Sequence, residues 1–283
     1  MVRIVADSTC DLSPELVKRY DITVLPLHIL LGDQEYRDGV DISPSEIYAW
    51  SDANKTTPKT SASSVDDTIA ALKPHLDRGD EVIAFGISEQ MSTSCNVIRM
   101  VAGSMEGGDR VTVVDSQNLS TGIGHLVIEA AILAAEGKSR EEIIKHIEAL
   151  RPLVRASFVV DTLVYLHRGG RCSGVAALAG GMLRLHPEIV VKDGGMIPTR
   201  KYRGKLDSVI LHYAKDMESD LLKARPDRVF ITHSGCDKAT VDSVRTYLES
   251  LHYFNEILET RAGGVVSSHC GPGTLGVLFI ANS

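Results

Sequence analysis

The sequence predicts an α/β protein with two domains, the first built on a mostly parallel sheet with helices on both faces. Short β-branched runs occupy residues 2–6, 82–86 and 111–114, and each is followed by small or polar residues and then by a stretch of helical periodicity. Strand–helix alternation of this kind is typical of parallel sheets. The first domain is therefore expected to be Rossmann-like, with ligands bound beyond the carboxyl ends of its strands.

Clear start signals mark the helices of this half. Ser43 and Glu46 have the spacing of a reciprocal capping box, and Ser139 with Glu142 repeats it. A serine followed by proline at 13–14 gives a third start, because proline is favoured at the first helical position. These signals support the assignment of the intervening stretches as helices.

A proline gives the candidate domain boundary. Arg151-Pro152 ends the helix that begins after Ser139, and the order of elements changes beyond it. The domains are therefore predicted at 1–153 and 154–283. The second is expected to be an α/β two-layer domain with strands at 156–160, 188–192 and 228–232, helices at 206–223 and 238–251, and closing strands.

Composition narrows the class of protein. The 283 residues are 43% hydrophobic and 24% charged, with a formal net charge of −7, which is typical of a globular protein and disfavours nonspecific binding to nucleic acid or anionic membranes. No apolar run reaches the roughly 18 residues of a membrane span. Five cysteines without a CxxC pair favour a reduced, cytoplasmic chain.

Common cofactor and catalytic signatures are missing from the sequence. It has no phosphate loop and no HExxH motif, and the segment at 86–90 lacks the closing glycine of a GxSxG elbow. Gly122 and Gly124 resemble the start of a dinucleotide fingerprint, but Val127 stands at the third glycine position, so we interpret these glycines as close packing. The histidines have no paired spacing with cysteines. We therefore predict no cofactor and no metal site.

Hydroxyl-rich loops follow or flank the predicted strands. They lie at residues 7–12, 60–64, 92–94 and 115–116. Each alone is explained as a turn or helix cap, since Ser, Thr and Asp accept from free helix N–H groups. Together at one sheet edge they would form a polar mouth able to hold an anion.

Several of these segments resemble motifs of the DegV family, in the same order, from about residue 3 to about residue 281. The segments are Asp7-Ser8-Thr9-Cys10-Asp11-Leu12, Pro58-Lys59-Thr60-Ser61, Val114-Asp115-Ser116 with Gly122 and Gly124, Asp161-Thr162-Leu163 through Arg168-Gly169-Gly170-Arg171, and Gly271-Pro272-Gly273. That family includes the fatty-acid-binding subunits of bacterial fatty acid kinases.

The resemblance implies a long-chain fatty acid, such as hexadecanoate, held in a buried tunnel with its carboxylate between the domains. It assigns the head group to Thr60 and Ser92, with His269 as a further candidate. It also implies that the chain is a lipid-binding protein and not an enzyme by itself. Conversion of the carboxylate to an acyl phosphate would belong to a separate kinase subunit.

The chain departs from the family pattern at positions near these residues. Ala62-Ser63 replaces the usual Gln-Pro, Thr93-Ser94 replaces Gly-Thr, and His186 replaces a lysine. The hydroxyl groups survive these changes, whereas tunnel shape and preferred chain length stay open.

Two arginines have two interpretations. The resemblance implies that Arg171 and Arg203, the latter in a basic stretch at 200–205, meet the kinase, whereas the alternative is a solvated charged loop. Two other functions also remain open: a hydrolase or acyltransferase with Ser92 or a neighbouring hydroxyl as nucleophile, and a sensor of a non-lipid small molecule. A thiol nucleophile at Cys270 beside His269 is disfavoured because adjacent residues rarely present their side chains to each other.

Overall fold

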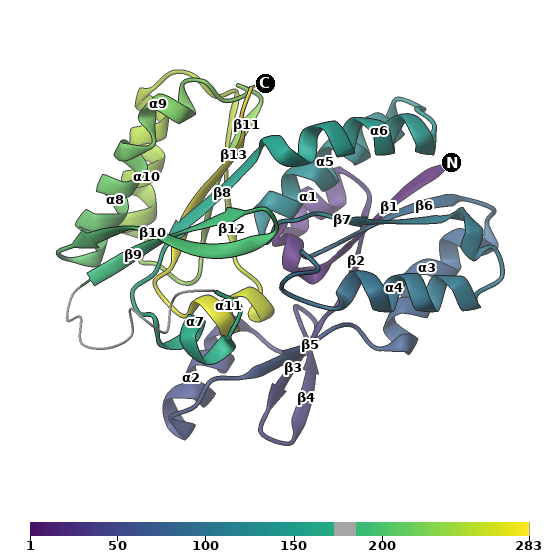
Figure 1. Cartoon of the computed structure of the whole chain (residues 1–283), viewed down its shortest axis with the longest axis horizontal. Coiled ribbons are helices and arrows are strands. Elements are labelled where there is room, and N and C mark those ends of the chain that lie inside the picture. Colours follow the sequence, from purple (N-terminus) through teal and green to yellow (C-terminus); the bar gives the residue numbers. More distant parts are fainter. Residues whose placement is uncertain (173–184, 283) are drawn as a thin grey trace.

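The computed structural model describes residues 1–172 and 185–282, which form three β-sheets and the helices packed on them (Figure 1). The first sheet is four-stranded, parallel throughout, with the order β2-β1-β6-β7. Its strands are β1 (Val2–Asp7), β2 (Ile22–Leu25), β6 (Glu81–Gly86) and β7 (Val111–Asp115). The parallel sheet predicted for the first half is confirmed.

Helices cover both faces of this sheet, as expected. Successive residues of β1 are buried on opposite faces, because side chains alternate along a strand: Ile4 and Ala6 join one apolar cluster, whereas Val5 joins another. The Val5 face packs against α3 (Val65–Asp77) and α4 (Ser94–Ser104), and the Ile4 face packs against α5 (Thr121–Ala135) and α6 (Arg140–Leu150). The short helices of this half are η1 (Ser8–Cys10), α1 (Pro14–Arg19) and η2 (Gly108–Arg110).

The second sheet is mixed and has six strands in the order β10-β9-β8-β13-β11-β12. Strands β11 and β12 are parallel, and the other neighbouring pairs are antiparallel. One face is covered by α8 (Leu206–Asp216) and α10 (Lys238–Ser250), whose Val209 and Val241 pack with Val277 of β13. The strands are β8 (Val154–Val159), β9 (Leu185–Lys192), β10 (Gly195–Arg203), β11 (Arg228–His233), β12 (Glu256–Arg261) and β13 (Leu275–Ile280).

Helix α5 lies between these two sheets, with contacts to β1 and β6 on one side and to β8 and β13 on the other (Figure 1). Every residue from 121 to 131 is buried. A helix that is apolar around its whole circumference must be enclosed on all sides. Gly124 permits the close approach, since a Cβ there would lie 2.8 Å from Leu12 Cδ2 and 3.1 Å from the Cys10 carbonyl. Gly124 is thus a packing residue, but it packs on η1 and Leu12 and not on a strand, and Gly122 lies against Asn118 in the loop before its own helix.

The third sheet was not predicted. It is antiparallel, with the order β4-β3-β5, and lies below the other two in Figure 1 beside α2 (Pro44–Asn54). The apolar run at 22–31 is divided at Pro26 into β2 and β3, because proline cannot donate a ladder hydrogen bond. The strands are β3 (His28–Leu31), β4 (Gln34–Arg37) and β5 (Lys59–Ser61), so the expected loop at 60–64 begins as a strand.

Two further predictions need correction. The long helix expected at 206–223 is two helices, α8 (Leu206–Asp216) and α9 (Glu218–Leu221), separated at Met217, whose N–H donates to the Ala214 carbonyl three residues earlier. The break lets Leu221 turn into the core. The basic stretch at 200–205 is not a loop, since β10 runs to Arg203 at the edge of its sheet, where charged residues discourage pairing with other strands.

The remaining helices of the described residues are η3 (Arg151–Leu153), α7 (Val164–Gly169), α10 (Lys238–Ser250) and α11 (Gly264–Cys270). The boundary predicted at 153/154 coincides with the start of β8. It stays a prediction, because α5 packs on both sheets.

Candidate functional site

A cavity of about 320 Å³ lies among the third sheet, the loops after β6 and β7, and α11. Its volume is at the small end of the usual range for ligand pockets, roughly 300–1,000 Å³. The apolar side chains on its wall are Leu27, Ala62, Ile87, Met91, Leu119, Met196, Val265, Val266 and Cys270, and the polar ones are Thr60, Ser61, Glu89, Gln90, Ser92, Thr93, Arg171 and His269. Apolar walls with grouped polar side chains suit an amphipathic ligand.

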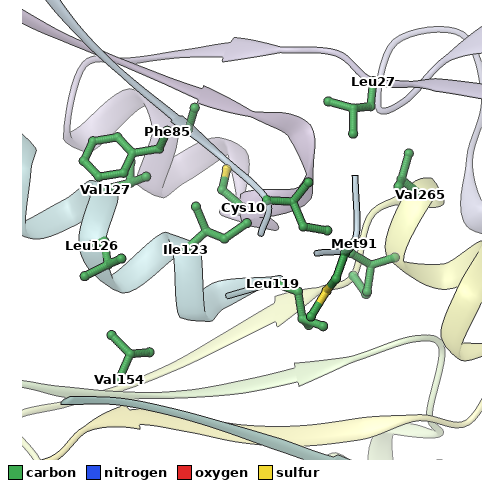
Figure 2. Close-up of a cluster of buried hydrophobic side chains, with 14 of the residues drawn as sticks. Cys10, Leu27, Phe85, Met91, Leu119, Ile123, Leu126, Val127, Val154 and Val265 are labelled. Atoms are coloured by element: carbon green, nitrogen blue, oxygen red, sulfur yellow. The ribbon is translucent and has the colours of Figure 1, made fainter. Parts of the chain in front are cut away.

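The apolar wall continues the protein core. Figure 2 shows Met91 and Leu119 beside the α5 side chains, with Leu27 and Val265 beyond them. All four belong to the same buried cluster as Phe85 of β6. The cavity is therefore an opening into the core and not a surface groove.

The topology explains why the loops converge here. The carboxyl ends of parallel strands meet at one edge of a sheet, and the loops after β6 and β7 supply Ile87, residues 89–93 and Leu119. The loop after β1, also expected at this site, does not line the cavity but supports it. The buried Asp7 carboxyl accepts from the Ile87 N–H at 2.9 Å and from Ser94 Oγ at 2.8 Å, which fixes the loop between β6 and α4.

Thr60 and His269, both predicted from the resemblance, meet in the cavity wall. Thr60 Oγ1 lies 2.7 Å from His269 Nε2. Burial, with a smaller contribution from the Arg171 charge, lowers the pKa of His269 to about 4, so the ring is neutral at pH 7. Its Nδ1 is buried and has no hydrogen-bond partner among residues 1–172 and 185–282. The missing side chain of Gly169 leaves room for that edge of the ring.

Ser92, the other predicted head-group residue, lines the same cavity. Its Oγ accepts from the Ser94 N–H at 3.2 Å, which leaves the hydroxyl proton to donate to a ligand. Helix α4 begins two residues later, and the side chain of its N-cap residue, Thr93, makes no capping hydrogen bond. The positive end of this helix therefore adjoins the hydroxyl.

The two arginines are separated by the structure. Arg171 lines the cavity, and its guanidinium donates to the carbonyls of Gly169 at 2.7 Å and Met91 at 3.4 Å. Arg203 is exposed at the far end of β10 from Met196, seven residues away along the strand, which corresponds to roughly 20 Å. Arg171 is thus placed to meet a ligand, whereas Arg203 can meet only something outside the cavity.

The geometry does not pair Ser92 with a base. In the described part of the chain no histidine hydrogen-bonds to Ser92, and the hydroxyl that meets the His269 ring is that of Thr60. Cys270 lines the cavity, but burial raises the pKa of its thiol, which keeps it protonated. His186, where the family has a lysine, is buried elsewhere and contacts the carbonyls of Val160 and Gly204.

Sequence reasoning missed most of the apolar wall. Leu27, Leu119 and Met196 stand in segments that look like ordinary core. Met91 offered one signal, because a flexible apolar side chain in a hydroxyl-rich loop is typical of a surface that adapts to a ligand.

Two kinds of feature are absent from residues 1–172 and 185–282. No helix there has the length and apolar character needed to cross a membrane. No cluster of three or more His, Cys, Asp or Glu side chains that could bind a metal ion occurs there either.

Comparison with known proteins gives matches over almost the whole chain. A family model described as "Uncharacterised protein, DegV family" matches residues 1–282. A DegV domain-containing protein of Deinococcus radiodurans is 34% identical over 277 residues, which are 98% of this chain and 97% of the relative.

Solved structures agree with the fold. A DegV family protein from Thermus thermophilus, described by its fatty acid binding, has 31% identity and a TM-score of 0.89, with 99% of each chain covered. A stearic acid-binding protein from Eubacterium ventriosum has 29% identity and a TM-score of 0.86, with 99% of this chain and 98% of the other covered. The expected fold class and the resemblance are confirmed: the chain belongs to the DegV family.

Proposed function

We propose that this protein binds a long-chain fatty acid, with hexadecanoate as the representative ligand, in the cavity beside α11. The observation that carries the proposal is the Thr60–His269 pair. Thr60 Oγ1 and His269 Nε2 lie 2.7 Å apart in the wall of a cavity that also has apolar walls. Relatives from Thermus thermophilus and Eubacterium ventriosum, described as binding fatty acid and stearic acid, support it.

The protonation of His269 determines how Thr60 can act. A neutral ring carries one proton, and with that proton on Nε2 the ring donates to Thr60 Oγ1. The hydroxyl proton of Thr60 is then directed away from the histidine and toward a carboxylate. Ser92 supplies a second O–H, and the Arg171 guanidinium supplies positive charge at the rim. This arrangement orients the head group.

The tail contributes most of the affinity. Each buried methylene contributes about 0.8 kcal/mol, and ordering the ligand costs several kcal/mol. A smaller cavity of about 20 Å³, which shares Leu119, Val266 and Cys270 with the main one, extends toward Phe158 of β8 and gives the tail a direction. Long acids should therefore bind better than short ones.

The protein would not act on the fatty acid alone. A separate kinase subunit would convert the bound carboxylate to an acyl phosphate, and Arg171 at the rim and Arg203 outside the cavity are the proposed contacts with it. Such a kinase works on a cytoplasmic nucleotide, so we place the protein in the cytoplasm. The absence of a disulfide among the five cysteines of the described chain fits that compartment.

Native mass spectrometry of the purified protein tests the binding proposal directly. The expected result is a species heavier than the chain by the mass of a long-chain acid, which organic extraction removes and added hexadecanoate restores. Protein that carries no such mass and that binds neither hexadecanoate nor stearate after extraction would contradict it. A Thr60→Ala/Ser92→Ala double variant is the matched control, since it should lose the adduct while staying folded.

A further inference from the structure

Helix α11 (Gly264–Cys270) forms one wall of the cavity with Val265, Val266, His269 and Cys270. It is only seven residues long. Helices of this length are not stable in isolation, so the position of His269 depends on what holds α11 at its start.

The start of α11 has no cap of its own. The N-cap residue is Gly263, which has no side chain that could accept from the N–H groups of the first turn. Instead, Asp11 Oδ1 accepts from the Gly263 N–H at 2.8 Å, and Asp38 Oδ1 accepts from the Gly264 N–H at 2.6 Å. These two carboxyl groups come from the opposite end of the sequence, 252 and 226 residues away. They satisfy N–H groups that a helix start leaves without partners.

Each carboxyl group is itself fixed by a second hydrogen bond. Ser120 Oγ donates to Asp11 Oδ2 at 2.5 Å, and Ser8 Oγ donates to Asp38 Oδ2 at 2.8 Å. Ser8 Oγ also accepts from the N–H of Leu27, which lines the cavity. Both aspartates are at most 5% exposed. The start of α11 is therefore tied to the loops that carry two other parts of the cavity wall.

The glycines at the junction make the fit close. A Cβ on Gly264 would lie 2.9 Å from Asp38 Oδ1 and 2.6 Å from Ile29 Cδ1, and a Cβ on Gly263 would lie 3.1 Å from Asp11 Oδ1. Such distances leave little room for α11 to shift while both carboxyl groups stay bonded. The Thr60–His269 hydrogen bond also tolerates little movement. Its donor–acceptor distance is 2.7 Å, and a shift of α11 by about 1 Å would lengthen it beyond the range of a hydrogen bond.

We propose that Asp11 and Asp38 are positioning residues for the head-group site: from the first half of the chain they fix the start of α11 so that His269 at its other end meets Thr60. The inference rests on the proposed function of that site for its effect on binding, but not for its effect on the histidine. Neither aspartate lines the cavity, so both act through α11.

The test compares Asp11→Ala, Asp38→Ala and the double variant with Asp11→Asn and Asp38→Asn. Alanine removes the acceptor, whereas asparagine keeps an oxygen for the glycine N–H and should rescue. Asp237→Ala is the matched control, since the Asp237 carboxyl caps α10 by accepting from the Thr240 N–H at 2.7 Å, and α10 contributes nothing to the cavity.

The first measurement needs no ligand: a long-range ¹H–¹⁵N spectrum of the histidine rings, assigned with His269→Gln. In the wild-type protein and in Asp237→Ala, His269 should show one neutral tautomer with the proton on Nε2. In the double alanine variant it should show averaged tautomers and titrate nearer the ordinary histidine pKa. The second measurement is hexadecanoate affinity, which should fall on the order of tenfold, as for loss of one hydrogen bond to a charged group.

A wild-type histidine spectrum in the double alanine variant would overturn the inference, as would an affinity loss no larger than that of Asp237→Ala. If the alanine variants do not fold, Ser8→Ala and Ser120→Ala keep both aspartates and remove the second hydrogen bond of each, although Ser8→Ala also removes the hydrogen bond from the Leu27 N–H. An unchanged His269 spectrum in both variants would overturn the inference equally. If the wild-type protein binds no hexadecanoate, the proposed function fails, and the histidine spectra still decide the inference.

Discussion

Thr60 and His269 are 209 residues apart in the sequence and 2.7 Å apart in the structure. One lies on β5 of the small antiparallel sheet, and the other lies on α11, just before the last strand of the six-stranded sheet. The pair therefore forms only when both halves of the chain are in place. The state of this hydrogen-bonded pair therefore depends both on whether a ligand is bound and on whether the two halves of the chain are packed together.

The hydroxyl groups of Thr60 and Ser92 give the first prediction. Thr60→Ala and Ser92→Ala should each weaken hexadecanoate binding by about 1.5–3 kcal/mol, because each removes one hydrogen bond to a charged acceptor. Isothermal titration of delipidated protein measures the loss. Ser104→Ala, which removes a hydroxyl bonded to the Val101 carbonyl at the end of α4, is the control. Full affinity in the double variant would remove both residues from the site.

The second prediction concerns chain length. Affinity for saturated acids from about eight to about eighteen carbons should rise by up to about 0.8 kcal/mol per methylene and then level off where the cavity ends. The rise follows from burial of the tail against Leu119, Val266 and their neighbours. Each acid is titrated below its micelle concentration. A flat series would mean that the tail stays in water.

Arg203 supports a prediction about the kinase. Arg203→Ala should leave hexadecanoate affinity unchanged, because the side chain is exposed and lies outside the cavity. It should slow phosphorylation of the bound acid by a cognate kinase. Lys201→Ala on the same edge strand controls for a general loss of charge. A parallel fall of affinity and phosphorylation would assign the arginine to the pocket or the fold instead.

Burial of Asp11 makes stability depend on pH. Desolvation, offset only in part by hydrogen bonds from Ser120 and Gly263 and reinforced by the nearby Asp38 and Asp7, raises its pKa from 3.8 to about 8. Between these values the folded protein holds a proton that the unfolded chain releases, so the free energy of unfolding falls as pH rises. Asp11→Asn cannot titrate and should lose less stability between about pH 5 and about pH 8. Urea unfolding of both proteins at the two pH values measures this, and equal losses would contradict it.

The sequence allowed a sound prediction of the regular parts of the fold. Strands β1, β6 and β7 follow from β-branched runs, and α2 and α6 follow from capping boxes that the structure contains at Ser43 and Ser139. These signals are local, so they can be read without knowledge of the partner elements. The small sheet was not predicted because β4 and β5 are short and largely polar, and only their pairing with β3 makes them strands.

The site shows the same division. Thr60, Ser92 and His269 were found through motifs, and the structure brings all three to one cavity. Leu27, Leu119 and Met196 could not be found, because an apolar residue beside a cavity and one inside a core follow the same pattern along the chain. Asp11 and Asp38 form their key contacts with glycines more than 200 residues away, a distance that no local pattern spans.

The place of α5 between two sheets has a consequence for synthesis of the protein. One side of this helix can be covered as soon as β1, β6 and β7 have left the ribosome. Its other side waits for β13 (Leu275–Ile280), whose Leu278 carbonyl bonds the His125 ring at 3.0 Å. Until then the nascent chain exposes an apolar helix face, and such a face can aggregate or be bound by chaperones. Folding of this protein should therefore be completed late, with the last strand.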